Sequence, residues 1–320
     1  MRTAYLAAPD FSDQLLAELT PYGQVSEVAD RVYLQDGPAH RCAWAVDVWF
    51  DVHEVPIESI GDAARILKSI QPFWRPLLRQ EPRRTGLIAD KLGLRPLAQQ
   101  EPPDGPKLRP SGVFTLLSRD RLLYASAHSR PFPGGEPPLT EDHCNPPSRA
   151  YRKLWEALLL LGDTPQPGQK VYDLGASPGS WTWALARYGC EVIAIDKAPL
   201  DDRITALPNV SFQQGSAFAL DPRHNQADWI CSDIICYPKR LHTFVDRWIE
   251  LGNCQRFVLT VKLQGVTDFD ALKAFQDLPN GVTTHLWFNK HEVTWIGHPS
   301  LSRDSTPQAW PWIATKPSPE

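Results

Sequence analysis

The stretch that most constrains the fold is residues 170–197, which read KVYDLGASPGSWTWALARYGCEVIAIDK. A short apolar run reaches Asp173 and is followed by a turn that contains two glycines. A helical pattern covers residues 180–188, and a second apolar run ends at Asp196. Strand, turn, helix and strand in this order form a βαβ unit, which predicts a mostly parallel sheet with helices on both faces.

The turn of this unit can bring the backbone close to a ligand. Gly175 and Gly179 have no Cβ to obstruct the approach, and Asp196 can accept hydrogen bonds from a ribose diol. The dinucleotide fingerprint G-x-G-x-x-G fails, because the turn reads Gly-Ala-Ser-Pro-Gly and Pro178 has no N–H to offer a pyrophosphate. An ordinary βαβ crossover, with glycines for packing only, is the alternative to a ligand site.

The form D-x-G-A-x-P-G-x-W over residues 173–181 resembles the S-adenosylmethionine site of class I methyltransferases, and among them the FtsJ-type RNA ribose methyltransferases. The resemblance implies that the turn meets the methionine part of the cofactor and that Asp196 takes its ribose. Ser216 stands where the family usually has an aspartate for the adenine amino group. The implied cofactor-binding residues are Ser148, Asp173, Gly175, Ser177, Pro178, Gly179, Ser180, Asp196, Ser216 and Asp233.

Polar residues also stand at the ends of the other apolar runs. Asp233 follows residues 229–232, and Lys262 ends the run Val-Leu-Thr-Val-Lys. Ligands of open parallel sheets bind at the carboxyl ends of the strands, so these side chains are candidates for a site. A lysine in an apolar run needs a partner, and Asp233 on the presumed neighbouring strand is the obvious one.

Lys153, Asp233, Lys262 and Glu292 stand in the order of the Lys-Asp-Lys-Glu tetrad of FtsJ-like 2′-O-methyltransferases. With the phrase over residues 232–240, they resemble the bacterial RlmM family, which methylates a cytidine ribose of large-subunit ribosomal RNA and carries an N-terminal RNA-binding region with a THUMP-type module. The resemblance implies a methyltransferase that uses S-adenosylmethionine and acts on 23S rRNA, or a fragment of it, before full assembly.

The tetrad suits this chemistry, because a ribose hydroxyl is a poor nucleophile at neutral pH and needs help with its proton. A neutral Lys262 could accept that proton if desolvation and the charge of Lys153 lower its pKa. Asp233 and Glu292 would orient the two lysines. Three alternatives stay open: a pair of structural salt bridges, a class I methyltransferase for a small molecule or a protein, and a non-catalytic RNA-binding module.

From Lys170 onward, strands alternate with helices. We expect strands near residues 170–175, 191–196, 209–214, 227–233, 256–263, 283–290 and 292–298, and helices near 179–188, 238–252 and 267–278. Ser148 follows two prolines and is expected to cap a helix that ends at Leu161. The predicted fold class is α/β: a Rossmann-like class I methyltransferase domain with a mostly parallel seven-stranded sheet, whose last two strands form an antiparallel edge.

A smaller α/β domain is predicted before it. Strands are expected over residues 4–8, 25–34 and 43–50, helices over 57–80 and 85–92, and a hairpin over 112–128. The proline-rich residues 96–110 predict an irregular connector. The predicted domains are an N-terminal, THUMP-like RNA-binding domain over 1–130, a Pro/Gly linker over 131–147, the methyltransferase domain over 148–298 and a loose tail over 299–320.

The formal net charge of −4 argues against a general nucleic-acid binder, yet one basic stretch exists. Its cations, with Phe73 and Trp74 between them, are Arg65, Lys68, Arg75, Arg79, Arg83, Arg84, Lys91 and Arg95. Cations with interleaved aromatics can hold phosphates and stack bases. A solvated helical face explains the pattern equally well.

The remaining expectations concern compartment and assembly. The six cysteines form no C-x-x-C pair and lie mostly in apolar runs, which predicts buried thiols in a reducing compartment and no structural zinc or other metal. No apolar stretch approaches the ~20 residues that a membrane span needs. We therefore expect a cytoplasmic monomer with RNA as its partner and no membrane contact.

Overall fold

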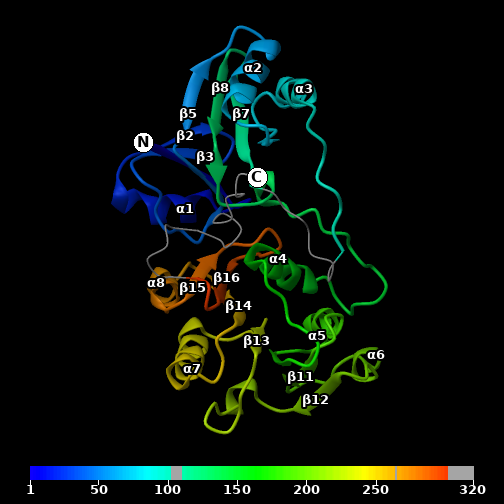
Figure 1. The fold of residues 1–320 in the computed structure, drawn as a ribbon. Helices are drawn as coiled ribbons and strands as arrows, with labels where there is room; N and C mark the ends of the chain where they lie inside the picture. Colours follow the sequence, from blue (N-terminus) through cyan, green and yellow to red (C-terminus); the bar gives the residue numbers. More distant parts are fainter. Residues whose placement is uncertain (102–109, 264, 302–320) are drawn as a thin grey trace. The chain divides into compact units, whose positions relative to one another are not determined.

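The computed structural model describes residues 1–101, 110–263 and 265–301. Of these, residues 1–99 and 110–138 form one compact unit, the N-terminal unit, and residues 100–101 and 139–301 form a second, the C-terminal unit (Figure 1). The predicted linker over 131–147 covers the point where the chain passes from one unit to the other. Most of the predicted connector over 96–110 and of the predicted tail over 299–320 lies outside the described residues.

The C-terminal unit is built on one seven-stranded sheet, in the order β12-β11-β10-β13-β14-β16-β15. The first five of these strands run parallel, and β16 pairs antiparallel with both of its neighbours. The Rossmann-like fold predicted from the alternation of strands and helices is therefore confirmed. The strands are β10 (Lys170–Leu174), β11 (Glu191–Asp196), β12 (Val210–Gln214), β13 (Trp229–Ser232), β14 (Phe257–Lys262), β15 (Gly281–Thr284) and β16 (Glu292–Gly297).

Helices cover both faces of this sheet, with α4 and α5 on one side and α7 and α8 on the other (Figure 1). Trp183 of α5 packs against Tyr151 and Trp155 of α4, with ring centroids 5.1 and 5.5 Å apart. Trp183 is therefore a packing residue between the two helices. The helices are α4 (Tyr151–Leu161), α5 (Ser180–Ala186), α6 (Asp202–Thr205), α7 (Pro238–Leu251) and α8 (Phe269–Asp277), with a 3-10 turn η3 (Ala217–Ala219).

Two predictions for this unit are wrong in detail. The helix that Ser148 was expected to cap begins at Tyr151, and its cap position is taken by Ala150, whose side chain accepts no hydrogen bond. Ser148 lies in the preceding turn, where its hydroxyl accepts a hydrogen bond from the backbone N–H of Ala150 at 3.3 Å. The strand expected over residues 283–290 ends at Thr284, because the next residues turn to meet a buried carboxylate described below.

Strands β15 and β16, at the antiparallel end of the sheet, pack closely against one tryptophan side chain. Gly281 of β15 lies opposite Gly297 of β16, and the indole of the fully buried Trp295 covers both glycines. A Cβ added at Gly281 would lie 2.5 Å from Trp295 Nε1, well inside van der Waals contact. The two glycines therefore make the space that the ring fills.

Replacing Gly281 with alanine tests this packing. We expect Gly281→Ala to lower the free energy of unfolding by about 1–3 kcal/mol, because a rigid indole cannot yield to the added methyl group. Denaturant unfolding measures the effect. Gly215→Ala is the control, since a Cβ there meets nothing within 4 Å and should change stability little. Equal losses in both variants would contradict the packing argument.

The N-terminal unit contains a five-stranded sheet, β2-β3-β1-β4-β9, and a four-stranded sheet, β5-β8-β7-β6. One buried cluster spans both sheets, and a second lies between α2, α3 and the four-stranded sheet. The strands are β1 (Arg2–Ala7), β2 (Val25–Ala29), β3 (Val32–Asp36), β4 (Ala45–Phe50), β5 (His53–Pro56), β6 (Trp74–Pro76), β7 (Gly112–Ser118), β8 (Arg121–Ala125) and β9 (Ala127–His128). The helical elements are α1 (Ser12–Leu19), α2 (Ile60–Ile70), α3 (Pro82–Leu92), η1 (Thr20–Tyr22) and η2 (Pro133–Gly135).

The hairpin predicted over residues 112–128 is confirmed as β7 and β8, but two other expectations for this unit are wrong. The single strand expected over 25–34 is two strands, β2 and β3, joined by a turn in which Arg31 has a φ of 58°. The helix expected over 57–80 ends at Ile70, and Trp74 starts β6, which pairs with β7. Pro72 and Pro76 explain the break, because proline cannot continue the hydrogen bonding of a helix.

No helix of the described residues combines the length and the apolar character needed to cross a membrane.

Candidate active site

Four charged side chains of the C-terminal unit form a closed ring of alternating sign, which we call the charge ring. Lys153 Nζ donates hydrogen bonds to both carboxylate oxygens of Asp233, at 2.8 and 2.7 Å, and to Glu292 Oε1 at 3.0 Å. Lys262 Nζ donates to Asp233 Oδ1 and to Glu292 Oε2, each at 2.6 Å. Each lysine therefore contacts both carboxylates, and the formal charges of the ring sum to zero.

Three neighbouring strands and one helix bring the charge ring together. Lys262 is the last residue of β14 and pairs directly with Glu292, the first residue of the antiparallel β16. Asp233 follows β13, which lies on the other side of β14. Lys153 comes from the first turn of α4. The structure thus joins all four residues that the sequence predicted as a tetrad.

The charge ring is mostly buried, and its partners decide the pKa of its members. Burial alone would raise the pKa of Asp233, but the charges of Lys153 and Lys262 outweigh it and lower that pKa. Burial would lower the pKa of Lys262, but the carboxylates of Asp233 and Glu292 outweigh it and raise that pKa. The expectation of a lowered Lys262 pKa is therefore wrong. Asp233 and Glu292 were expected to orient Lys262, but the effect of their negative charges on its pKa was left out.

A further carboxylate, missed in the sequence, supports the ring from α4. Glu156 is fully buried, and it accepts hydrogen bonds from the backbone N–H groups of Trp287 at 2.8 Å and Phe288 at 3.3 Å. These bonds hold the turn that leads from β15 to Glu292. Its signal was present: Glu156 is an acidic residue three positions after Lys153, on the same face of a helix whose other charged residue is Arg152.

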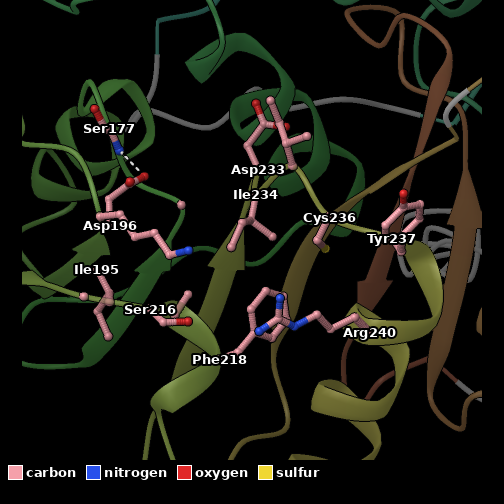
Figure 2. Close-up of a pocket in the computed structure, with 15 residues that line it drawn as sticks. Ser177, Ile195, Asp196, Ser216, Phe218, Asp233, Ile234, Cys236, Tyr237 and Arg240 are labelled. Carbon is pink, nitrogen blue, oxygen red and sulfur yellow. Dashed lines mark hydrogen bonds between the residues drawn. The ribbon is translucent and has the colours of Figure 1, made fainter.

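A cavity of about 560 Å³ opens beside the charge ring at the carboxyl ends of β10, β11, β12 and β13. Figure 2 shows Ser177, Asp196 and Ser216 on one side and Asp233, Cys236 and Tyr237 on the other. Five of the ten predicted cofactor residues line it, namely Gly175, Ser177, Asp196, Ser216 and Asp233. The ring and the cavity share Asp233.

Backbone hydrogen bonds fix the carboxylate of Asp196 in this wall. Its two oxygens accept from the N–H groups of Ser177 at 3.0 Å (Figure 2) and of Ala198 at 2.9 Å. Gly175 has a φ of 78°, and a Cβ there would lie 2.7 Å from Ile234 Cα. A side chain larger than hydrogen is therefore excluded at the point where the turn faces the cavity.

The other five predicted cofactor residues do not line the cavity. Ser180 donates a hydrogen bond to the carbonyl of Ser148 at 2.6 Å, so the pair ties the start of α5 to the turn before α4. Gly179 has a φ of 111° and packs against Ile204, and Pro178 precedes it. Asp173 is fully buried beneath the turn and accepts a hydrogen bond from Thr182 Oγ1 at 2.6 Å.

Several lining residues escaped the sequence analysis. Arg240 lies over the ring of Phe218, with its guanidinium carbon 4.0 Å from the ring centroid. Ile235 and Tyr237 line the cavity from the loop after Asp233. The phrase over residues 232–240 contains Ile235, Tyr237 and Arg240, but the resemblance that it carries assigned none of them to the site.

These residues fit an adenosyl cofactor. Asp196 uses each oxygen for one backbone hydrogen bond and retains lone pairs for a ribose diol. The missing Cβ at Gly175 lets Ile234 pack closely against the turn in the cavity wall, and Phe218 offers an apolar ring. No group of three or more His, Cys, Asp or Glu side chains in the described part of the chain is arranged to hold a metal ion.

Comparison with known proteins decides the family. Residues 146–309 match the FtsJ-like methyltransferase family, which is just over half of the chain. The chain belongs to this family. The match confirms the resemblance inferred from the glycine turn and the tetrad. It also confirms S-adenosylmethionine as the expected cofactor of this FtsJ-like protein.

Curated relatives carry the name ribosomal RNA large subunit methyltransferase M. The protein of Azoarcus sp. is 34% identical over 154 residues, covering 46% of this chain and 42% of the relative. The protein of Xanthomonas campestris is 31% identical over 228 residues, covering 68% and 61%. A solved ribosomal RNA methyltransferase from Plasmodium falciparum, described as putative, aligns with 49% of this chain and 99% of its own, at 20% identity and a TM-score of 0.36. This chain spans between 42% and 61% of the length of such curated relatives.

The buried Asp173 generates a prediction of pH dependence. Desolvation raises its pKa from 3.8 to about 7, against the hydrogen bond from Thr182. Because the folded-state pKa is the higher one, the contribution of Asp173 to stability is full below about pH 4 and is lost as the pH rises through 7. Asp173→Asn removes this titration, so the free energy of unfolding of the variant relative to wild type should rise by up to about 4 kcal/mol between about pH 4 and pH 8.

Denaturant unfolding at several pH values measures this difference. Asp36→Asn is the matched control, since Asp36 is an exposed carboxylate at the end of β3. The free energy of unfolding of Asp36→Asn should change with pH in the same way as that of wild type. The same pH dependence in Asp173→Asn and wild type would show that Asp173 does not titrate in this range.

Proposed function

We propose that the protein transfers a methyl group from S-adenosylmethionine to a ribose 2′-hydroxyl of RNA, and that the nucleotide is a cytidine of 23S rRNA. The observation that carries the proposal is the charge ring beside the nucleoside-sized cavity, with Asp233 belonging to both. The names of the curated relatives support ribosomal RNA as the substrate class.

In this proposal the cavity binds the cofactor. Asp196 accepts hydrogen bonds from the ribose diol, and Ser216 with Phe218 borders the adenine end. Asp233 lies where it can attract the positively charged methionine end. Bound S-adenosylmethionine supplies an electrophilic methyl carbon. The residues of the chain position the ribose and accept its proton.

Lys262 is proposed as the proton acceptor. The bound cofactor would supply the methyl carbon and the sulfur that leaves it, and Lys262 Nζ would accept the proton that the ribose hydroxyl loses as its O2′ takes the methyl group. Asp233 and Glu292 hold the amine in position through hydrogen bonds of 2.6 Å. Lys153 keeps the two carboxylates in place and balances their charge.

The raised pKa of Lys262 gives this mechanism a consequence. At neutral pH the amine holds its own proton, because two carboxylates favour the charged form. Only the small neutral fraction can accept a proton from the ribose. The rate of the chemical step therefore grows with that fraction as the pH rises.

Methyl transfer to an unmodified 23S rRNA transcript tests the function. Wild type should incorporate labelled methyl groups into dinucleotides that resist alkali, because a 2′-O-methyl group blocks cleavage of the neighbouring phosphodiester. The rate should rise about tenfold per pH unit between about pH 7 and pH 9. Lys262→Ala should lose at least about 100-fold in rate.

Lys262→Arg is the matched variant, because arginine keeps the positive charge of the ring but cannot accept a proton. It should fold with near-wild-type stability and still lose the activity. Full activity in Lys262→Arg would mean that the ring is only a structural set of salt bridges. Label that alkali releases would indicate base methylation, and transfer to a protein or small molecule without RNA would favour another substrate class.

The N-terminal unit is proposed to bind RNA through the basic stretch of residues 65–95. Two of its eight cations pair with carboxylates, Arg65 with Asp62 and Arg79 with Asp30. The other six form no ion pair with a carboxylate among the described residues. Arg75 is half-buried, and its guanidinium donates a hydrogen bond to the carbonyl of Arg95 at 3.3 Å. A half-buried cation without a counter-ion favours an anionic ligand.

A cavity of about 400 Å³ in this unit supports the assignment. Phe73, Arg75 and Arg95 line it, and Phe73 is half-exposed. Cations beside an exposed aromatic ring can hold a backbone phosphate and a base at the same time. This cavity is therefore the proposed centre of RNA binding in the N-terminal unit.

Substitution of the two arginines tests this role. Arg75→Gln together with Arg95→Gln should weaken binding of the 23S rRNA transcript about tenfold and reduce the salt slope by about two, since each phosphate contact releases a counter-ion. Arg65→Gln is the control, because Arg65 is exposed and paired with Asp62. Fluorescence anisotropy measures the affinities. Equal changes of RNA affinity in the double variant and the control would show that the basic stretch is only a solvated surface.

A further inference from the structure

Exposed apolar side chains of the C-terminal unit lie in the two loops that follow Asp233 and Lys262 of the charge ring. Ile235 and Tyr237 follow Asp233 and are 78% and 73% exposed, and Val266 follows Lys262 and is 89% exposed. The strands that end before them, β13 and β14, are parallel neighbours, so both loops leave the same edge of the sheet. Apolar side chains that share one exposed surface next to a reaction centre indicate a binding surface.

Tyr237 is held in a defined backbone position. It lies in an extended conformation directly before Pro238, the first residue of α7. A residue before proline has few backbone conformations available, so the loop presents the exposed ring with little freedom to lose on binding. Figure 2 shows the ring beside the cavity, next to Cys236.

Two cations accompany the ring in the first turn of α7. Lys239 and Arg240 are exposed, and this first turn contains no acidic residue. Positive charge at a helix N-terminus opposes the helix dipole, so these residues cost helix stability and call for another role. Lys239 forms no ion pair with a carboxylate in the described ranges, and Arg240 stacks on Phe218.

We propose that residues 235–240 form an acceptor platform, on which an unpaired RNA nucleotide stacks its base on Tyr237 while Lys239 contacts a backbone phosphate. The proposal rests on the function proposed above and names the structure that holds its substrate. Aromatic rings interleaved with cations are the composition that binds single-stranded nucleic acid.

The burial of the charge ring supports an unpaired substrate. Only 16% of the Lys262 side chain is exposed, so a ribose must enter the site to bring its hydroxyl to Nζ. A ribose within a regular helix is held between its stacked neighbours and cannot be inserted without unstacking. Stacking on Tyr237 would compensate for that lost stacking. Because every base has an aromatic face, the platform provides affinity more than base selection.

Steady-state kinetics and binding test the platform with three variants and the 23S rRNA transcript. Tyr237→Ala should raise the KM for RNA about tenfold. Tyr237→Phe keeps the ring and should behave like wild type. Leu251→Ala is the control, since Leu251 is an exposed apolar residue at the other end of α7.

Charge is tested separately. Lys239→Gln should reduce the salt slope of RNA binding by about one, whereas Lys273→Gln, which removes an exposed lysine from α8, should leave it unchanged. Anisotropy with the same transcript measures both slopes. Equal slopes for the two variants would overturn the role of Lys239.

The outcomes separate the platform from the function. A wild-type enzyme that methylates RNA with an unchanged KM in Tyr237→Ala overturns the platform and leaves the function standing. A wild-type protein that transfers no methyl group to RNA overturns the function. In that case the binding data decide: weaker RNA binding by Tyr237→Ala but not by Leu251→Ala supports the platform, and equal binding overturns it.

Discussion

Mutual neutralisation of two lysines and two carboxylates is the interaction on which the site depends. Removing one partner from a buried ion pair leaves an uncompensated charge, which typically costs about 3–5 kcal/mol. Lys153, Asp233, Lys262 and Glu292 satisfy one another over distances of 2.6 to 3.0 Å. Three strands and α4 must therefore meet at one point. The ring thereby also fixes Asp233, which forms part of the wall of the neighbouring cavity.

The antiparallel strand β16 makes the ring possible. Lys262 ends β14, and the first residue of a strand can lie opposite it only if that strand runs in the other direction. Glu292 is that first residue. Glu156 then holds the turn before β16 through the N–H groups of Trp287 and Phe288. The antiparallel strand β16 thus contributes to the same site as the parallel strands β13 and β14.

The sequence predicted much of the C-terminal unit, because its signals are local. The alternation of strands and helices indicated the fold class, and the resemblance to the FtsJ-like tetrad indicated all four members of the ring. Prediction failed where distant contacts override local patterns. Residues 57–80 have a helical apolar stripe, yet Trp74 joins a strand because β7 offers a partner far along the chain. Glu156 was missed because the two N–H groups that it binds belong to residues 131 and 132 positions further along the chain.

By itself, the sequence determined the βαβ unit, the glycine turn and the polar residues at the strand ends, because chain order and periodicity dictate these features. Only the tertiary structure decided how those residues act on one another. Lys153 and Glu292 are 139 positions apart in the chain and 3.0 Å apart in the ring. The sign of the pKa shift of Lys262 follows from such distances, since electrostatic energy depends on separation in space and not on separation along the chain.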